Sequence, residues 1–383
     1  MNTFLLNNYT MDELARKFYY LIPEEVKKVV KILIDKNKEV FIVGGAVRDF
    51  LMGFPVKDYD IATDAFPEEM IDWFKKEAIK VVTMGQEYGT LLVIVNKLAF
   101  DVSTYRNEIF DIPGKPPRVT YVNTLLEDLQ RRDFQINSLA FDPVSQKIID
   151  KLNILNDFNI RIIRTINNPK KVLLDDGLRL IRLARLMAQL EFEPESPLKE
   201  TAMIIGSSIK FRNRKSLKIE FLKLIGLSNP VKGFKFLLET GSFSQIFPQL
   251  RIDTNNSFLY SDSFIENFKL LNQQQIWVRL FSLILFLQKF ELEETTIENV
   301  SQNLDLNEKE LKIMKRIYNS WINFPKPVHL FDLKRWIRST GLVTSIELLK
   351  LIFLYAELIN DSILLTNKEE ILKQSFNLIK NMK

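Results

Sequence analysis

One stretch, residues 41–64 (FIVGGAVRDFLMGFPVKDYDIATD), constrains the fold of this chain more than any other. Its apolar start, the glycine pair Gly44 and Gly45, and its apolar end indicate a strand, a glycine turn, a helix and a second strand. Side chains on a strand alternate between two faces, so Asp58 and Asp60 are predicted to project side by side. Two adjacent carboxylates repel each other unless a cation lies between them. The stretch therefore predicts a cation site next to a glycine turn.

The same residues indicate phosphate chemistry. Paired carboxylates are the hard oxygen ligands that Mg²⁺ takes together with substrate phosphates. Backbone N–H groups at a glycine turn that opens a helix attract an anion, and Arg48 adds a positive charge nearby. Together these features suggest nucleotidyl transfer. The alternative is an exposed strand with alternating Asp residues, since the D-x-D pattern alone is weak.

Composition narrows the available chemistry. With 383 residues the chain is expected to form two to four domains, and 46% hydrophobic and 26% charged residues are typical of a soluble globular protein. Cys is absent, which excludes disulfides and thiolate metal sites, and His329 is the single His, which excludes His-rich metal clusters and a fused HD-type phosphohydrolase domain. Carboxylates and hard cations must therefore carry any transfer chemistry.

The charge distribution suggests a nucleic-acid partner. Net charge is +5, but residues 161–218 hold thirteen Lys or Arg and six Asp or Glu, a net of +7. Such a concentration fits the electrostatic footprint for nucleic acid, although a solvated helical face is the alternative. The first ten residues lack a basic leader and a long apolar core, and apolar runs such as Leu280 to Leu287 are too short to cross a bilayer. We expect a cytoplasmic protein with no membrane contact.

Two further segments surround the predicted site. Residues 80–83, 91–96 and 98–105 are predicted strands, and Asp101 interrupts the last of them. It is either a third acid beside Asp58 and Asp60, where it would ligate a metal or orient the attacking hydroxyl, or an edge-strand charge that faces water. Residues 107–118 hold three prolines and are predicted to be a mobile loop.

Polar residues at helical spacing follow downstream. Asp133 and Asn137 lie at i and i+4, so a helix would place them on one face, where they could hold ribose hydroxyls while Arg132 attracts phosphates. Asp176 and Arg179 are predicted to be neighbours on a later helix, and a carboxylate beside a guanidinium offers what reading a base edge requires. Capping and solvated ion pairs are the respective alternatives.

In this order the motifs resemble those of the class II tRNA nucleotidyltransferases and bacterial poly(A) polymerases, members of the polymerase-β-like superfamily. GGAVRD with the D-Y-D of residues 58–60 is similar to the first family motif, and RRDFQIN (131–137) to the second. Residues 167–186 match the stretch with the templating motif Glu-Asp-x-x-Arg, in which Asp175 here replaces Glu. The resemblance covers roughly the first 225 residues.

The resemblance implies an α+β fold: a polymerase-β-like nucleotidyltransferase head with a mixed β-sheet, followed by an all-α neck, body and tail. The implied boundaries are 1–150 for the catalytic head, 151–215 for a neck that selects the base, 216–255 for the body and 256–383 for a tail that binds tRNA. Oligomeric state does not follow from the sequence, and no obligatory protein partner is predicted.

The resemblance also implies residue roles. Asp58 and Asp60 would bind two Mg²⁺ ions. Asp101 is predicted to be a further catalytic acid from its place in the strand, and not from the resemblance. An RNA 3′-hydroxyl would attack the α-phosphate of the incoming nucleotide in line, and pyrophosphate would leave. Asp176 and Arg179 would read the Watson–Crick edge of C or A. The full implied nucleotide-binding set is Gly44, Gly45, Arg48, Arg132, Asp133, Asn137, Asp176, Arg179, Arg182 and Arg185.

The branch of the family is suggested by two segments. GQEYGTLLV (85–93) resembles the Gly-x-x-x-Gly-Thr turn of the tRNA enzymes, which favours addition or repair of 3′-terminal CCA on the tRNA acceptor arm from CTP and ATP. The near-full-length segment 107–118 argues against a CC-only enzyme, although DIPGKPP stands where the family has Asp-x-Arg-Arg-Pro. A CC-adding or A-adding enzyme, a poly(A) polymerase, and an RNA-binding protein without catalysis are the alternatives.

Overall fold

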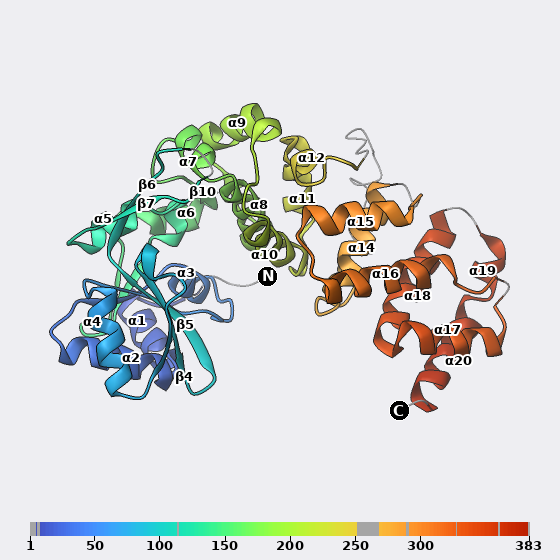
Figure 1. Cartoon of the computed structure of the whole chain (residues 1–383), viewed down its shortest axis with the longest axis horizontal. Coiled ribbons are helices and arrows are strands. Elements are labelled where there is room, and N and C mark those ends of the chain that lie inside the picture. The colour runs from blue at the N-terminus through green and yellow to red at the C-terminus, as the bar shows by residue number, and fades with distance from the viewer. Residues whose placement is uncertain are drawn as a thin grey trace. The chain divides into compact units, whose positions relative to one another are not determined.

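The computed structural model describes residues 5, 8–112, 115–250, 268–288, 291–326, 328–358 and 361–381 (Figure 1). The chain divides into two compact units. The first unit comprises residues 1–179 and 192–200, and the second comprises residues 180–191 and 201–383. The finer division into neck, body and tail stays a prediction, and its boundary at 255/256 lies outside the described residues.

A seven-stranded mixed sheet forms the centre of the first unit, in the order β3-β4-β5-β2-β1-β8-β9. β2 pairs with β5 in parallel, whereas the other neighbours in this sheet are antiparallel. The mixed sheet and the strands predicted at 80–83, 91–96 and 98–105 are confirmed. The strands are β1 Val40–Val43, β2 Asp60–Thr63, β3 Lys80–Val82, β4 Thr90–Val95, β5 Leu98–Thr104, β8 Ala140–Asp142 and β9 Lys147–Ile149.

Helices cover this sheet and bury its apolar side chains. The ring of Phe18, on the first helix, lies 5.0 Å from the rings of both Phe50 and Phe141, which joins that helix to α3 and β8. Tyr105 and Leu129 are fully buried in a cluster that joins the sheet to α5. The helices of this unit are α1 Met11–Leu21, α2 Glu24–Asp35, α3 Gly45–Leu51, α4 Pro67–Lys76, α5 Leu125–Gln130, α6 Ile154–Ile160 and α7 Pro169–Asp175.

Local sequence signals account for these helix ends. Thr10 and Glu13 form a capping box at the start of α1, and Thr124 and Glu127 form another at the start of α5. Pro67 occupies the first turn of α4, where its missing N–H leaves no hydrogen bond unmade. The start of α5, the helix that precedes Arg131 and Arg132, is thus set by its own N-terminal cap.

The predicted loop 107–118 is only partly a loop. Strand β6 (Arg106–Ile109) pairs antiparallel with β7 (Arg118–Tyr121) in a separate two-stranded sheet. The prediction was wrong at both ends, because it followed the prolines, which lie between the strands and not in them. Residues 113 and 114, inside the remaining loop, lie outside the described residues, and so does the predicted mobility at that point.

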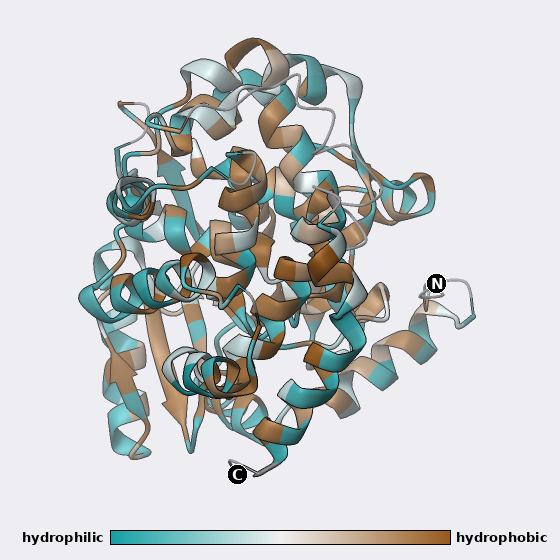
Figure 2. Cartoon of the chain, turned by 90° about the vertical axis from the view of Figure 1, so that its right-hand side faces the viewer, coloured by the Kyte–Doolittle hydropathy of each residue, from teal (hydrophilic) through white to brown (hydrophobic). Residues whose placement is uncertain are grey.

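Over its described residues the second unit consists of helices and the turns that join them. The range predicted as an all-α neck, 151–215, also contains a small two-stranded parallel sheet of β10 (Ile162–Ile163) and β11 (Glu193–Pro194), both in the first unit. α14 is buried along ten of its twelve residues and forms the centre of this unit. Figure 2 shows other helices banded in hydrophobic and hydrophilic residues, as expected for amphipathic packing. The helices are α8 Leu178–Leu190, α9 Ser196–Ile205, α10 Arg214–Ile225, α11 Val231–Glu239, α12 Ser242–Ile246, α14 Ile276–Leu287, α15 Glu294–Asn303, α16 Glu308–Ile322, α17 Leu330–Thr340, α18 Leu342–Leu358, α19 Ser362–Thr366 and α20 Lys368–Asn381, and the first residues of α8 and α9 belong to the first unit.

In the described part of the chain no single helix is both long and apolar enough to cross a membrane. Two consecutive helices are long and apolar enough only when they are taken together, and the chain bends by 117° between them; they are Leu330–Thr340 and Leu342–Glu357.

Candidate active site

The predicted carboxylates lie at the start of β2. Asp60 is the first residue of that strand and is aligned with Asp101 on the parallel strand β5. Neighbouring strands lie about 4.8 Å apart, and aligned residues of a parallel pair share a face, so the two acids are adjacent. Asp58 and Asp60 are exposed and Tyr59 between them is buried, which is the alternation the sequence predicted. The prediction that Asp58 itself belongs to the strand was wrong, because pairing begins at Asp60.

Asp101 is electrostatically linked to this pair. Asp101 is exposed, but the protein around it still changes the pKa of its carboxyl. Burial raises the pKa of the Asp101 carboxyl, the guanidinium of Arg106 opposes that effect, and the negative charge of Asp58 raises the pKa further. Over the described residues no group of three or more Asp, Glu or His side chains is arranged to hold a metal ion. A direct role for Asp101 in metal binding therefore stays a prediction.

The glycine turn brings a guanidinium close to these acids. Gly44 has φ +76° and ψ −133°, a backbone conformation that side chains with a Cβ rarely adopt. A Cβ placed on Gly44 would lie 3.1 Å from Nη1 of Arg132, 3.5 Å from Oδ2 of Asp60 and 3.9 Å from the carbonyl oxygen of Asn137. A guanidinium and a carboxylate therefore both lie close to the backbone of the turn. Gly45 follows as the first residue of α3.

Arg48 connects α3 to the second predicted motif. Its side chain is buried, and its Nη1 donates to Oδ1 of Asn137. Nε and Nη2 of Arg48 both donate to Oδ1 of Asp49, at 2.8 and 2.6 Å. Nδ2 of Asn137 donates to Oδ1 of Asp133 at 3.4 Å. Three predicted site residues, Arg48, Asp133 and Asn137, therefore form one chain of hydrogen bonds.

The helix predicted to carry Asp133 and Asn137 is absent. Helix α5 ends at Gln130, and Asn137 closes a short 3₁₀ turn, Gln135–Asn137. Asp133 leaves the helical path because its Oδ1 accepts a hydrogen bond from the N–H of Phe134 at 2.8 Å. The 3₁₀ turn still brings the two side chains together, so the predicted neighbours are correct although the element was wrong.

Arg132 is held between two acceptors. Its Nη2 lies 3.3 Å from Oδ2 of Asp128, and its Nη1 donates to the carbonyl oxygen of Asn137 at 3.3 Å. Its Nε is buried and has no hydrogen-bond partner. The guanidinium lies beside the turn at Gly44, and its contact with phosphate stays a prediction.

The base-reading motif also differs from its predicted geometry. Asp176 and Arg179 were predicted on one helix, but α7 ends at Asp175 and α8 begins at Leu178. Asp176 is extended, with φ −142° and ψ 110°, and its Oδ1 accepts from the N–H of Leu178 at 3.0 Å. The Asp side chain thus caps a new helix, which is why the first helix stops there. The N–H of Arg179 donates to the carbonyl oxygen of Asp176 at 3.1 Å, so the two residues remain close.

Two contacts fix the Arg179 side chain, which is only 8% exposed. Nη1 donates to the carbonyl oxygen of Val172 at 3.1 Å, and the guanidinium carbon lies 5.1 Å from the centre of the Phe110 ring. Burial raises the pKa of the Asp175 carboxyl. The positive charges of Arg179 and Lys171 oppose that effect, and the negative charge of Asp176 adds to it. Phe110 was missed by the sequence analysis, and the signal available was an aromatic residue at the edge of a proline-rich segment.

Arg182 and Arg185 belong to the second unit and share one carboxylate. Nε of Arg185 donates to Oε2 of Glu220 on α10 at 3.0 Å, and Nε of Arg182 lies 3.7 Å from Oε1 of the same residue. Nη1 of Arg185 donates to Oε1 of Gln189 at 3.0 Å. The roles predicted for both arginines in a nucleotide pocket stay predictions, and Glu220 is the acceptor that the two side chains share.

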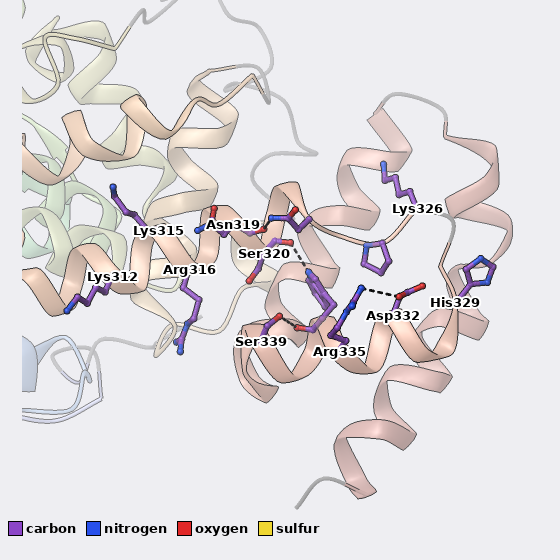
Figure 3. A pocket seen from close by; sticks show the side chains of 13 residues that line it. Lys312, Lys315, Arg316, Asn319, Ser320, Lys326, His329, Asp332, Arg335 and Ser339 are labelled. Carbon is purple, nitrogen blue, oxygen red and sulfur yellow. Dashed lines mark hydrogen bonds and ion pairs between the residues drawn. The ribbon is translucent and has the colours of Figure 1, made fainter.

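The second unit also contains a basic cavity of ≈ 800 Å³ between α16 and α17 (Figure 3). Lys312, Lys315 and Arg316 line it from α16 at helical spacing, and Arg335 lines it from α17. Nε1 of the lining residue Trp336 donates to the carbonyl oxygen of Ser320 at 2.7 Å and joins the two helices. Basic side chains outnumber acidic ones in the lining of this cavity, and one of them, Lys315, also pairs with Glu294 and Glu298.

Comparisons with known proteins agree with this picture. Residues 40–164 match the family model described as the poly A polymerase head domain. A CCA-adding enzyme of Ligilactobacillus salivarius is 32% identical over 289 residues, covering 73% of this chain and 67% of that protein. A CCA-adding enzyme of Enterococcus faecalis is 32% identical over 324 residues, covering 82% of this chain and 75% of that protein.

Solved structures show the same fold. A CCA-adding enzyme of Bacillus stearothermophilus in complex with CTP has a TM-score of 0.66 and 23% identity, over 87% of this chain and 78% of that chain. A tRNA nucleotidyltransferase complexed with a primer tRNA and an incoming ATP analog has a TM-score of 0.64 and 19% identity, over 90% of this chain and 99% of that chain. The polymerase-β-like head and helical remainder are thus confirmed, and the chain belongs to the family of CCA-adding enzymes.

Proposed function

We propose that this chain adds or repairs the 3′-terminal CCA of tRNA with CTP and ATP. One observation carries the assignment to a chemical step: a Cβ added to Gly44 would lie 3.1 Å from Nη1 of Arg132 and 3.5 Å from Oδ2 of Asp60, so a guanidinium and a carboxylate both lie close to the backbone of this turn. A triphosphate needs a cation and close approach to the backbone, and a hard metal needs carboxylates. Family membership supports the identity of the substrates.

The donor set fits Mg²⁺. Asp58 and Asp60 provide exposed carboxylate oxygens, and the effect of Asp58 on the pKa of Asp101 indicates negative charge that a cation would neutralise. Asp58 and Asp60 would hold the metal ions, which when bound stabilise charge on the attacking and leaving oxygens of nucleotidyl transfer. Asp101 would contribute further negative charge beside Asp60.

The protein residues would orient the incoming nucleotide. Arg132, beside the Gly44 turn, would contact the triphosphate, which carries the opposite charge. The hydrogen-bonded chain of Arg48, Asn137 and Asp133 would meet the ribose, because it offers both donors and acceptors. The 3′-oxygen of the RNA then forms a bond to the α-phosphate while the bond to pyrophosphate breaks.

Base selection would fall to Asp176 and Arg179. The guanidinium of Arg179 donates to the carbonyl oxygen of Val172 and also contacts the Phe110 ring. These two contacts restrict the orientation of its remaining N–H donors. A guanidinium held in this way can discriminate between bases by the acceptors they present. Arg182 and Arg185 would complete the nucleotide pocket, as the family resemblance implies.

The acceptor arm of tRNA would contact the second unit through phosphates. The cavity between α16 and α17 presents Lys312, Lys315 and Arg316 in a fixed arrangement, and cationic side chains bind RNA backbone without reading sequence. Replacing Lys312 and Arg316 together by Ala should weaken tRNA binding and flatten its dependence on salt. Unchanged binding at all salt concentrations would exclude this surface.

The function is tested with three tRNAs that end at the discriminator base, at C and at CC. Each is incubated with CTP alone, ATP alone and both nucleotides, and the products are sized at single-nucleotide resolution. CCA addition predicts two C residues from CTP alone, one A on the tRNA ending in CC, and completion with both. Addition of only C or only A would assign a specialised enzyme, and long A tails on a generic oligo-RNA would assign a poly(A) polymerase.

The catalytic assignment is tested with Asp58→Ala. The side chain is exposed, so its removal should leave folding intact and abolish incorporation of labelled CTP. Incorporation at the wild-type rate would show that the chemistry lies elsewhere.

A further inference from the structure

A buried carboxylate outside the predicted site controls the arginine at the glycine turn. Asp128 lies on α5 and is 1% exposed. Its Oδ1 accepts from Nε of Arg131 at 2.9 Å and from the N–H of Arg106 at 3.2 Å, and its Oδ2 accepts from Nη2 of Arg132 at 3.3 Å. Both oxygens of this buried carboxylate therefore accept hydrogen bonds, and Oδ2 accepts from Arg132, a residue predicted to bind the nucleotide.

The charge balance keeps Asp128 ionised. Burial acts to raise the pKa of this carboxyl, but Arg131 and Arg132 together with the hydrogen bonds it accepts lower the pKa below its ordinary value. A buried carboxylate that stays charged forms stronger and more directional hydrogen bonds than a neutral group. Asp128 can therefore fix the plane of the Arg132 guanidinium.

Arg132 has few other anchors. Its Nε is buried without a partner, and its second bond goes to a neutral carbonyl oxygen, that of Asn137. Both Arg132 and the Asp60 carboxylate lie within 3.5 Å of the point where a Cβ on Gly44 would stand. A guanidinium released from Asp128 would have an opposite charge nearby in Asp60, which is a proposed metal ligand.

The same carboxylate joins Arg132 to the hairpin β6–β7. Nη1 of Arg131 lies 2.6 Å from Oε1 of Glu108 on β6, and Nε of Arg106 lies 3.1 Å from the same oxygen. Arg106 in turn donates from Nη1 to Oγ1 of Thr90 at 2.5 Å. The network ties the hairpin, the start of β4 and the glycine turn into one arrangement with Asp128 at its centre.

We propose that Asp128 is a positioning residue, which holds the guanidinium of Arg132 in the orientation that contacts the phosphates of the incoming nucleotide. The proposal rests on the nucleotide-binding part of the proposed function. It does not require that the chain complete CCA. Asp128 itself touches no substrate, and it acts through Arg132.

The test uses Asp128→Asn in the full-length chain, because Asn keeps the shape and removes the charge. The matched control is Asp157→Asn: Asp157 is also a buried Asp of the first unit, and it accepts from Nε of Arg164 at 2.9 Å. Binding of CTP without tRNA is measured by equilibrium dialysis, with the KM for CTP and kcat measured separately on tRNA that lacks CCA. We expect CTP binding to weaken by about tenfold or more in Asp128→Asn, the size of one charged hydrogen bond, and KM to rise more than kcat falls.

A double-mutant cycle separates positioning from general destabilisation. In the background of Arg132→Ala, Asp128→Asn should add almost nothing to the loss of CTP binding, whereas independent effects would multiply. If Asp128→Asn does not give folded protein, Asp128→Glu takes its place, since it keeps the charge but moves it along a longer side chain, and it should also raise the KM for CTP.

Three results would overturn the proposal. They are equal losses of CTP binding in Asp128→Asn and Asp157→Asn, multiplicative losses in the Arg132→Ala background, and a wild type that binds neither CTP nor ATP. A wild type that binds CTP with the expected Asp128 dependence but adds no CCA would contradict the proposed function and leave the role of Asp128 supported.

Discussion

Exchange of Gly44 for Ala tests whether the turn is shaped for a ligand or only for the backbone. At φ +76° and ψ −133° an Ala residue is strained, with an expected loss of about 1–3 kcal/mol in the free energy of unfolding. Its methyl group would also lie 3.1 Å from Nη1 of Arg132, closer than ordinary van der Waals contact, so the guanidinium must move by a few tenths of an ångström.

Gly45→Ala is the matched control. Gly45 is the first residue of α3, and an added Cβ would lie 3.5 Å from Nη2 of Arg48, an ordinary contact. Ala is favoured over Gly in helices by up to about 1 kcal/mol, so this variant should be as stable as the wild type or slightly more stable. The two variants thus add the same methyl group at neighbouring positions with opposite expected effects.

The assay combines urea unfolding with steady-state incorporation of CTP into tRNA that lacks CCA. Gly44→Ala should lose stability by the stated amount, and its kcat/KM for CTP should fall by more than tenfold at a temperature where the variant remains folded. Wild-type kcat/KM for CTP in Gly44→Ala would refute the idea that the space beside Gly44 receives the nucleotide, and Gly45→Ala serves as the control for stability only.

Further expectations follow from the contacts of Arg179, Arg279 and Glu220. Arg179→Ala should relax the choice between C and A more than it weakens tRNA binding, and Phe110→Leu should do so to a smaller degree because a cation–π contact contributes about 0.5–2 kcal/mol; equal misincorporation by wild type and variants would contradict both. Arg279→Met should stabilise the second unit by about 1–4 kcal/mol in urea unfolding, because all three nitrogens of this guanidinium are buried without hydrogen-bond partners; a loss of stability would refute this. Burial lowers the pKa of Arg279 to about 10 from its ordinary value of 12.5, so the folded state binds fewer protons between these values and wild-type stability should rise with pH there, a slope that the Met variant lacks. Glu220→Gln should destabilise α8 against α10 by about 1–3 kcal/mol, since it removes the carboxylate shared by Arg182 and Arg185, and an unchanged urea midpoint would contradict this.

Local sequence patterns were sufficient for the glycine turn and the acids. Gly44 and Asp60 are set by short-range signals, namely a strand that ends in glycines and an alternation of buried and exposed residues. The polar pairs downstream were identified correctly as neighbours, but their elements were not. Helical spacing describes Asp133 and Asn137 as well as it describes a 3₁₀ turn, and it ignores the ability of Asp176 to cap its own backbone.

Long-range contacts explain what the sequence could not supply. Phe110 meets Arg179 only because the hairpin β6–β7 and the start of α8 come together, and nothing in either segment encodes that meeting. Asp128 was not among the residues predicted to form the site. Its burial depends on two arginines and on a backbone N–H from the hairpin, more than twenty residues earlier in the chain.

The parallel pairing of β2 with β5 has a consequence for biosynthesis. Asp60 and Asp101 are aligned across this pair, and residues 64–97, including α4, β3 and β4, must leave and return before the alignment forms. Contacts between residues so far apart in the sequence form slowly, because the chain loses the entropy of loop closure before strand pairing stabilises it. On the ribosome, a nascent chain from which Gly44, Asp58 and Asp60 have already emerged still lacks strand β5, which pairs with β2. The acids are therefore brought into register only after β5 has emerged, and a truncated product that ends before it carries the motif without the site.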